Sequence, residues 1–397
     1  MKKICLLLLS ALLIALFTAC SNTPSDISEG SETTTDAAPE SEAVFTEPTA
    51  PLITEEEILR QTVVDYMKKM GTVEWTPEKT MDFSKAHSEK LIYTAGTTYR
   101  GMPYTNFRGG YEIFASALNK KGVYSGPVNY QKTYGNTCAT SIKNAWMQVG
   151  NSFDFEFSID MMPYYKDSGV LAIGDIPWEK YDEKNTTRSI VKHCDAATLY
   201  DAYAQMKPGD AFVRYLDTSG HAIMVTGEVK VFRGNNGTIL PSRSTIVCTD
   251  QTGSFKTAKE GEPLSTWNID IERSFEYLYQ EGYLPVTIAE LRDGKHEEPK
   301  LYIASEPTAE LIAKTRTFRG AVNSNFKMAS VTSTLTNKSG KILFTDISYP
   351  EGKVFSLSNL TETFKLKTMI PGTYTLNVKA VIGFGEFDVF DLTFTLN

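Results

Sequence analysis

The chain has 397 residues, 22% of them charged, and a net charge of −8, values typical of a soluble globular protein long enough for two domains. They exclude a multi-span membrane protein and a wholly disordered chain, and the negative charge argues against nucleic-acid binding. Seven acidic residues lie between residues 21 and 54, so residues 55–397 carry a net charge of only −3. No strongly charged partner is therefore expected for the folded part.

The first twenty residues have the features of an export signal. Lys2 and Lys3 precede an apolar run, residues 4–17, that is too short for a stable membrane-spanning helix. The segment Leu16-Phe17-Thr18-Ala19-Cys20 then resembles a bacterial lipobox, whose cysteine is lipidated and becomes the mature N-terminus. The resemblance implies a lipoprotein signal peptide (residues 1–20) and an extracytoplasmic protein anchored to the bacterial cell membrane through Cys20. A plain secretory signal is the alternative.

Residues 21–54 are rich in Ser, Thr, Pro, Glu and Ala and contain almost no large apolar side chains. This composition predicts a disordered acidic linker, because such a segment cannot bury enough apolar area to offset the entropy lost on ordering. Apolar residues then recur at helical spacing over residues 55–70, so the folded part is expected to begin at residue 55.

Periodicity and turn signals predict helices and strands alternating along the next two hundred residues. Residues 255–300 are expected to mix helix and loop. The predicted elements are helices over residues 138–149 and 196–206 and strands over residues 211–216, 221–227 and 244–250.

Beyond residue 301 the pattern changes to short strands with frequent turns. Apolar and polar residues alternate over residues 373–380 and again over residues 390–396, which predicts half-buried strands. The segment 371–376 resembles the late strands of bacterial immunoglobulin-like modules. Residues 301–397 are therefore expected to form a small, noncatalytic all-β sandwich, since they contain no Cys and no His.

Cys138 stands at the start of a predicted helix. Asn136 or Thr137 is expected to cap this helix by accepting hydrogen bonds from its first turn. The helix dipole would stabilise a thiolate at this position, and neighbouring N–H groups would bind an oxyanion. Cys138 is either a nucleophile or a small core residue. The residues that share its face are apolar: Ile142, Ala145, Trp146 and Val149.

His221 begins a predicted strand, and Gly220 before it allows a substrate or another backbone to approach closely. A catalytic base of this kind needs a third polar group to fix its imidazole ring. Asp250 and Gln251, at the end of the following strand, both offer an oxygen atom. Strand alternation points their side chains to opposite faces, so only one of them is expected to reach His221.

The order of these features resembles the NlpC/P60 superfamily of papain-like cysteine peptidases, which cut bacterial cell-wall peptides. The resemblance covers roughly residues 95–255. It rests on Thr137-Cys138-Ala139, on Lys207-Pro208-Gly209-Asp210 and on Gly220-His221-Ala222-Ile223-Met224-Val225-Thr226-Gly227. Gly101-Met102-Pro103-Tyr104 is also similar to the family's Gly-x-Pro-Tyr segment. Many members have Asp-Cys-Ser around the cysteine and His, Asn or Gln as the third residue, so this chain departs from the pattern at both places.

The resemblance implies an α+β, papain-like domain over residues 55–300, in which the helix carrying the cysteine packs on an antiparallel sheet. It implies hydrolysis of amide bonds in peptidoglycan stem peptides, with Cys138 as nucleophile, His221 as base and Asp250 as third catalytic residue. Tyr104 and Gln251 are the expected substrate-binding residues. No metal, cofactor or nucleic acid is implied, and the protein is expected to act as a monomer.

Two other functions fit the same residues. The papain-like part could be inactive, which would leave the C-terminal module to bind a cell-wall or host ligand. Alternatively, the same catalytic residues could serve a transpeptidase or an amidase acting on other acyl groups. Cys248 is expected to be a core residue, and Cys194 is not expected to form a catalytic pair with the adjacent His193, because neighbouring side chains diverge. His87 and His296 are expected to be solvated.

Overall fold

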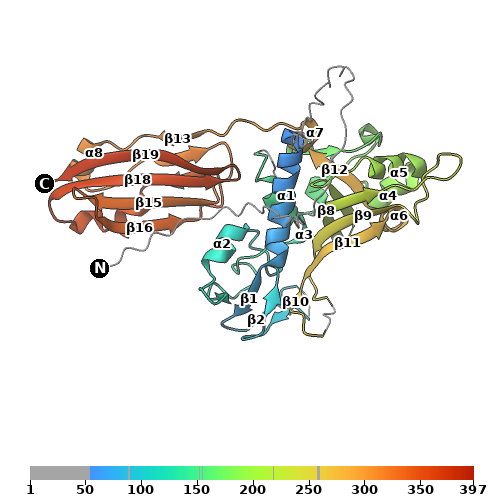
Figure 1. Ribbon diagram of the computed structural model, residues 1–397, viewed down its shortest axis with the longest axis horizontal. Helices are drawn as coiled ribbons and strands as arrows, with labels where there is room; N and C mark the ends of the chain where they lie inside the picture. The colour runs from blue at the N-terminus through green and yellow to red at the C-terminus, as the bar shows by residue number, and fades with distance from the viewer. Residues whose placement is uncertain (1–53, 88–89, 152, 154, 218, 257–259) are drawn as a thin grey trace, which may run out of the picture. The chain divides into compact units, whose positions relative to one another are not determined.

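The computed structural model describes residues 54–397 except 88–89, 152, 154, 218 and 257–259. The expected signal peptide, Cys20 and the acidic linker up to residue 53 lie outside the described residues. The described residues belong to one compact unit of mixed α+β structure (Figure 1). They contain two clusters of buried apolar side chains, one formed by residues 59–291 and the other by residues 312–396.

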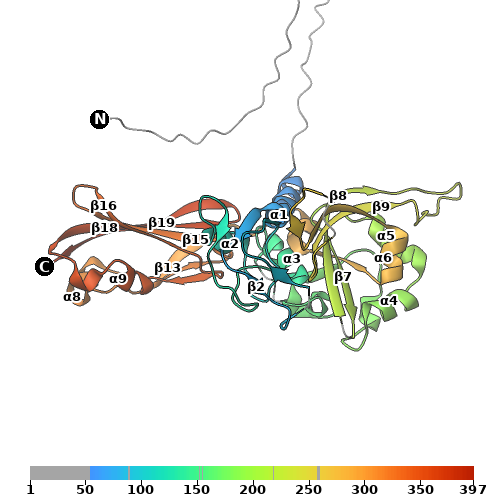
Figure 2. The same cartoon turned by 90° about the horizontal axis from the view of Figure 1, so that it is seen from below.

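A six-stranded antiparallel sheet lies at the centre of the N-terminal part, with the strand order β11-β9-β8-β7-β12-β6. The middle strand β8 is completely buried from Ala222 to Val225, because both faces of the sheet are covered there. Helices α1 and α3 lie on one side of the sheet, and α4, α5 and α6 lie on the other (Figure 2). The strands are β6 (Val170–Ala172), β7 (Ala211–Leu216), β8 (Ser219–Lys230), β9 (Thr245–Gln251), β11 (Trp267–Ser274) and β12 (Leu284–Ile288).

The described residues up to 300 contain seven α-helices. The first, α1, begins at a capping box, in which Thr54 accepts from the N–H of Glu57 at 3.2 Å and the Glu57 carboxylate accepts from the N–H of Thr54 at 2.7 Å. Helix α3 packs against both α1 and β8. The helices are α1 (Glu55–Thr72), α2 (Tyr111–Ser116), α3 (Cys138–Trp146), α4 (Thr187–His193), α5 (Ala196–Ala204), α6 (Phe275–Glu281) and α7 (Ala289–Asp293).

Smaller elements complete the N-terminal part. A four-stranded sheet has the order β10-β4-β1-β5, and β2 pairs with β3. Among the described residues no helix is both long and apolar enough to cross a bilayer. The short strands are β1 (Glu74–Pro77), β2 (Met81–Asp82), β3 (Ile92–Tyr93), β4 (Tyr99–Arg100), β5 (Val123–Tyr124) and β10 (Leu264–Ser265), and the 3-10 helices are η1 (Ile159–Met161), η2 (Lys166–Ser168) and η3 (Trp178–Lys180).

The C-terminal part contains two antiparallel sheets, with the orders β13-β14-β17 and β16-β15-β18-β19. Residues of β15 and β18 are buried at every second position, which is the period expected of strands that cover a core with one face. Its elements are β13 (Leu301–Ala304), α8 (Ala309–Thr315), β14 (Ala321–Ser324), β15 (Ser330–Asn337), β16 (Ile342–Ser348), β17 (Val354–Ser356), α9 (Asn359–Thr363), η4 (Leu366–Thr368), β18 (Gly372–Ile382) and β19 (Gly385–Leu396).

Most of the predicted elements are confirmed within a few residues, including the helix that begins at Cys138 and the strand that contains His221. The mixture of helix and loop predicted for residues 255–300 is confirmed for the helices α6 and α7, but it missed the strands β11 and β12, which belong to the central sheet. Strand β11 has a register shift between Asn268 and Ile271, with Asp270 at a φ of 50°, and this bulge interrupts the alternation that marks a strand.

Candidate active site

Cys138 is held at the first turn of α3 by a capping box. The hydroxyl oxygen of Thr137 accepts from the N–H of Thr140 at 3.4 Å, and the Thr140 hydroxyl accepts from the N–H of Thr137 at 2.9 Å. The cysteine is only 7% exposed, and most of the helix that follows it is buried. Its thiol therefore lies at the positive end of a helix dipole that is held firmly in the core.

His221 and Asp250 come from the neighbouring strands β8 and β9. His221 Nε2 lies 3.1 Å from Asp250 Oδ2. The imidazole also forms a hydrogen bond with the Cys138 thiol, and the contact with Asp250 leaves Nδ1 for this bond. The structure thus brings together the three residues that the sequence predicted as catalytic, and Asp250 rather than Gln251 reaches the imidazole.

Asp250 is completely buried and is surrounded by donors. Besides His221, Asn268 Nδ2 donates to Oδ2 at 2.9 Å and the Arg273 guanidinium donates to Oδ1. Burial alone raises the pKa of Asp250, but these three partners outweigh it and lower the pKa to about 2. The carboxylate is therefore charged at neutral pH. Sequence reasoning missed Asn268 and Arg273, because they lie on β11, which was not predicted.

The electrostatics of the pair favour a thiolate and an imidazolium. Burial raises the pKa of the Cys138 thiol, but His221, the N–H of Ala222 and the Ser158 hydroxyl stabilise the thiolate and bring the pKa below its ordinary value. Burial lowers the pKa of His221, whereas Asp250 and Cys138 together raise it to about 9. Both shifts populate the ion pair that a nucleophilic cysteine needs near neutral pH.

Tyr104 lies beside the thiol because its segment pairs with the segment that precedes α3. Tyr104 and Asn136 form an isolated parallel β-bridge, and the N–H of Thr105 donates to the Asn136 carbonyl at 2.9 Å. Burial and the neighbouring Cys138, to which it hydrogen-bonds, raise the pKa of Tyr104 well above 10. Tyr104 therefore keeps its proton and faces Cys138 as a hydrogen-bond donor.

Gln251 is not brought to this site, contrary to the expectation that it binds substrate. Its side chain is completely buried, and Nε2 donates to the carbonyl oxygen of Met102 at 2.9 Å. Because successive side chains of a strand point to opposite faces, Gln251 leaves β9 on the side away from Asp250. Its contact fixes the backbone two residues before Tyr104.

Cys138 borders a cleft with a volume of about 380 Å³. Ser158 also lines the cleft and is 5% exposed, and its hydroxyl forms a hydrogen bond with the Cys138 thiol. A Cβ atom on Gly220 would lie 2.9 Å from the Cβ of Ser158, so only glycine leaves room for this serine. The sequence indicated a close approach at Gly220, but nothing in it identified Ser158 as the partner.

His87 is exposed, as expected, but it also lines the cleft. Its ring centroid lies 4.9 Å from that of Tyr104 and 5.6 Å from that of Tyr130, with both pairs stacked. His296, by contrast, is half-buried and stacks 4.2 Å from Phe384, so the expectation that it is solvated is wrong. In both cases the aromatic partner comes from a different segment of the chain, so the residues next to each histidine in the sequence did not predict the stacking.

The other two described cysteines do not belong to this site. Cys194 and Cys248 are buried, and neither forms a disulfide within the described part of the chain. Burial raises the pKa of both thiols, whereas the pKa of Cys138 is lowered. The prediction that Cys248 is a core residue is confirmed, and Cys194 is buried as well.

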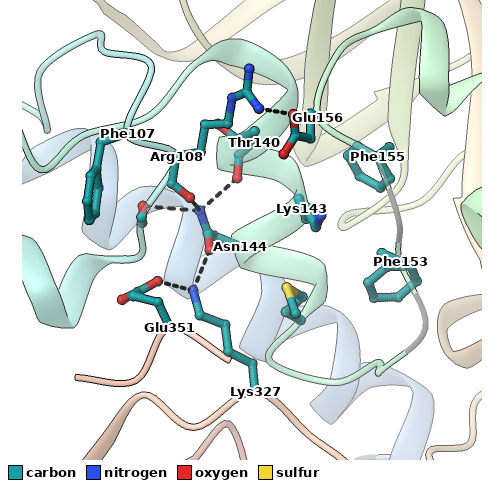
Figure 3. A pocket seen from close by; sticks show the side chains of 12 residues that line it. Phe107, Arg108, Thr140, Lys143, Asn144, Phe153, Phe155, Glu156, Lys327 and Glu351 are labelled. Atoms are coloured by element: carbon teal, nitrogen blue, oxygen red, sulfur yellow. Dashed lines mark hydrogen bonds and ion pairs between the residues drawn. The ribbon is translucent and has the colours of Figure 1, made fainter. Parts of the chain in front are cut away.

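A second cavity, with a volume of about 270 Å³, is shown in Figure 3. Glu156 lines both cavities. One wall of the second cavity comes from α3, through Thr140 and Asn144, and another comes from the C-terminal part, through Lys327 and Glu351. The helix that carries Cys138 therefore contacts the C-terminal part about two turns beyond the cysteine.

Within the described ranges, no group of three or more His, Cys, Asp or Glu side chains is arranged to hold a metal ion. The sequence matches no protein-family profile, and no curated protein matches it.

Proposed function

We propose that this protein is a papain-like cysteine peptidase of the NlpC/P60 type that hydrolyses amide bonds in peptidoglycan stem peptides. The observation that carries the proposal is the hydrogen-bonded series Cys138, His221 and Asp250, with the cysteine at a helix N-terminus. A nucleophile, a base and a group that orients the base are the parts that acyl transfer through a thioester requires.

In the first half of the reaction, the Cys138 thiolate attacks the carbonyl carbon of the scissile amide. An S–C bond forms and the carbonyl oxygen becomes an oxyanion. Its donors would be the N–H groups at the start of α3 and the Tyr104 hydroxyl. The His221 imidazolium then gives its proton to the amide nitrogen, the C–N bond breaks, and the amine leaves while a thioester remains.

In the second half, the neutral His221 takes a proton from a water molecule that attacks the thioester carbonyl. The C–S bond breaks, the carboxylic acid product leaves, and the thiolate–imidazolium pair is restored. Asp250 stays ionised throughout, because its pKa of about 2 lies far below that of the imidazolium. Its role is to hold the ring with Nδ1 toward the sulfur and to stabilise the positive charge.

The proposed substrate follows from the family-like motifs around Tyr104, Cys138 and His221 and from the export signal with its lipobox. The bond between γ-D-Glu and the diamino acid is the proposed cleavage point. The C-terminal part, proposed as an immunoglobulin-like β-sandwich, would hold the enzyme at the wall or bind a surface ligand.

The test is digestion of purified peptidoglycan with the full chain, followed by mass spectrometry of the released peptides. Wild-type protein should release fragments that carry a new amino terminus. Cys138→Ala should release none while keeping the fold, because the change removes a single sulfur atom, and Cys194→Ala should be as active as wild type. Equal digestion by Cys138→Ala would remove this residue from the role of nucleophile. If wild-type protein is inactive while the C-terminal part binds the wall, the protein is a binding protein.

A further inference from the structure

The loop of residues 106–110 contributes residues to both the Cys138 cleft and the second cavity. Arg108, in this loop, has a φ of 68°, in the left-handed region that non-glycine residues rarely adopt. Its Nε donates to Asn106 Oδ1 at 3.1 Å, and the guanidinium lies 4.7 Å from the centroid of the Phe157 ring and pairs with Glu156. Glu156 and Phe157 both line the cleft, so Arg108 supports one side of its rim.

The ion pair between Arg108 and Glu156 does not by itself fix this rim. The Glu156 side chain is 55% exposed, and an ion pair in such a position contributes little because water screens it. The position of Arg108 therefore depends on what holds its backbone.

Several hydrogen bonds hold that backbone. Within the N-terminal part, the N–H of Asn106 donates to the Tyr130 carbonyl at 2.9 Å and the N–H of Gly109 donates to the Gly135 carbonyl at 3.1 Å. Three more bonds involve Asn144 and Glu351, which come from different parts of the molecule. The Asn144 amide of α3 donates to the carbonyl oxygens of Arg108 at 3.3 Å and Gly109 at 3.1 Å. From the C-terminal part, the Glu351 carboxylate accepts from the N–H of Gly110 at 3.1 Å. The loop is thus bonded on one side to the catalytic helix and on the other to the C-terminal part.

Lys327 connects Asn144 with Glu351, as Figure 3 shows. Its ammonium donates to Asn144 Oδ1 at 2.8 Å and pairs with Glu351. The side chains of Lys327 and Glu351 are 10% and 21% exposed, and Asn144 is 3% exposed. A charge that is largely buried is stable only beside an opposite charge, so loss of either residue leaves the other poorly compensated.

We propose that Lys327 and Glu351 are positioning residues for the active site, through which the C-terminal part fixes the loop of residues 106–110 and with it the substrate-binding rim at Arg108. The proposal deepens the proposed function and rests on it for its kinetic consequence. It makes the C-terminal part a contributor to substrate binding rather than a spacer. Neither residue touches Cys138 or His221, so the chemistry of the thiolate itself should not depend on them.

The first experiment needs no substrate. In the full chain, hydrogen–deuterium exchange is compared between wild type, Lys327→Met, Glu351→Ala and the control Lys353→Met, whose lysine bonds to the Asn151 carbonyl at the same interface instead of serving the loop. Lys327→Met and Glu351→Ala should each speed exchange in residues 106–110 at least tenfold. Glu351→Gln keeps an oxygen for Gly110 but removes the charge that faces Lys327, so it should restore only part of the protection. If the loop exchanges equally in all variants, the proposal is wrong, whatever the enzyme does.

The second experiment tests whether the rim at Arg108 contributes to substrate binding. With a synthetic stem peptide, Lys327→Met and Glu351→Ala should raise KM about tenfold and leave kcat within about twofold, because the rim binds substrate while the thiolate reacts as before. Alkylation of Cys138 by iodoacetamide should proceed at the wild-type rate in each variant. A fall in kcat together with slower alkylation would show that the residues only stabilise the fold, which overturns the positioning role. Absence of activity in wild type would count against the proposed function, while the exchange result would still decide this inference.

Discussion

Replacing Asp250 by Asn tests whether the buried carboxylate sustains the reactive thiolate. The change keeps the size of the side chain and one oxygen, but removes the charge that faces His221. Asp250 and Cys138 raise the pKa of His221 to about 9, and without the carboxylate this pKa should fall toward its ordinary value of 6.5. The imidazolium would then lose its proton near neutral pH, and the Cys138 thiolate would lose its counter-charge.

The size of the effect follows from the contact that is lost. A hydrogen bond involving charged groups contributes about 1.5–3 kcal/mol. This corresponds to a factor of roughly ten to one hundred in the population of the thiolate–imidazolium pair. Alkylation of Cys138 at pH 7 should slow by the same factor, because only the thiolate reacts.

The assay measures the rate of iodoacetamide alkylation at each cysteine by peptide mass spectrometry between pH 5 and pH 10. Cys194 and Cys248 serve as internal references, since burial raises the pKa of both thiols. Glu272→Gln is the matched control, because this carboxylate lies on β11 near Arg273 but is 52% exposed. The control should react like wild type. Asp250→Asn should react slowly at Cys138 until the pH approaches the pKa of an ordinary thiol.

A double variant controls for the loss of stability that Asp250→Asn is expected to cause. Asp250→Asn leaves the buried Arg273 guanidinium without its carboxylate, which can cost about 3–5 kcal/mol of stability. The double variant Asp250→Asn with Arg273→Met removes both charges and should recover the thermal unfolding temperature without recovering reactivity. If either folded variant alkylates at the wild-type rate with an unchanged pH profile, Asp250 does not sustain the thiolate and the reasoning fails.

Three further predictions concern the cleft, the pH dependence of stability and the C-terminal part. Gly220→Ala should displace Ser158, because the added Cβ would lie 3.0 Å from its Oγ, and should slow Cys138 alkylation severalfold; an unchanged rate would contradict the role given to Ser158. The lowered pKa of Asp250, about 2 against 3.8, adds stability above pH 4 that disappears as the pH falls toward 2, and the raised pKa of His221 adds stability below pH 6.5 that disappears as the pH rises to about 9. Urea unfolding should therefore show the largest excess of wild-type stability over that of Asp250→Asn between about pH 4 and pH 6.5. A constant difference in the free energy of unfolding from pH 2 to 10 would refute this prediction. Residues 301–397 alone should give a cooperative unfolding transition with β-type circular dichroism, since they have their own apolar core, and residues 55–300 should show the raised KM of Lys327→Met; a C-terminal fragment that stays unfolded would contradict the boundary at residue 301.

The sequence alone was sufficient for the elements that carry the catalytic side chains. Capping residues and apolar spacing predicted a helix that begins at Cys138, and alternation predicted the strands that hold His221 and Asp250. These signals are local, because a helix cap or a strand face is set by residues within a few positions of one another. The same local signals failed for β11, where a bulge breaks the alternation.

Only the tertiary structure decided between Asp250 and Gln251, whose residue types made both plausible. The choice depends on which face of β9 meets His221, and on Asn268 and Arg273 of a neighbouring strand that stabilise a buried charge. Ser158 beside Gly220 and His87 stacked on Tyr104 also come from segments far apart in the chain.

The link from Lys327 and Glu351 to the loop at Arg108 was equally invisible in the sequence, where the C-terminal part looked like an independent module. Such contacts form because packing two cores in one chain removes charged side chains from water, so each must find a partner on the facing surface. The partners lie 183 and 241 residues apart in the chain and meet only in three dimensions, so no local periodicity predicts them.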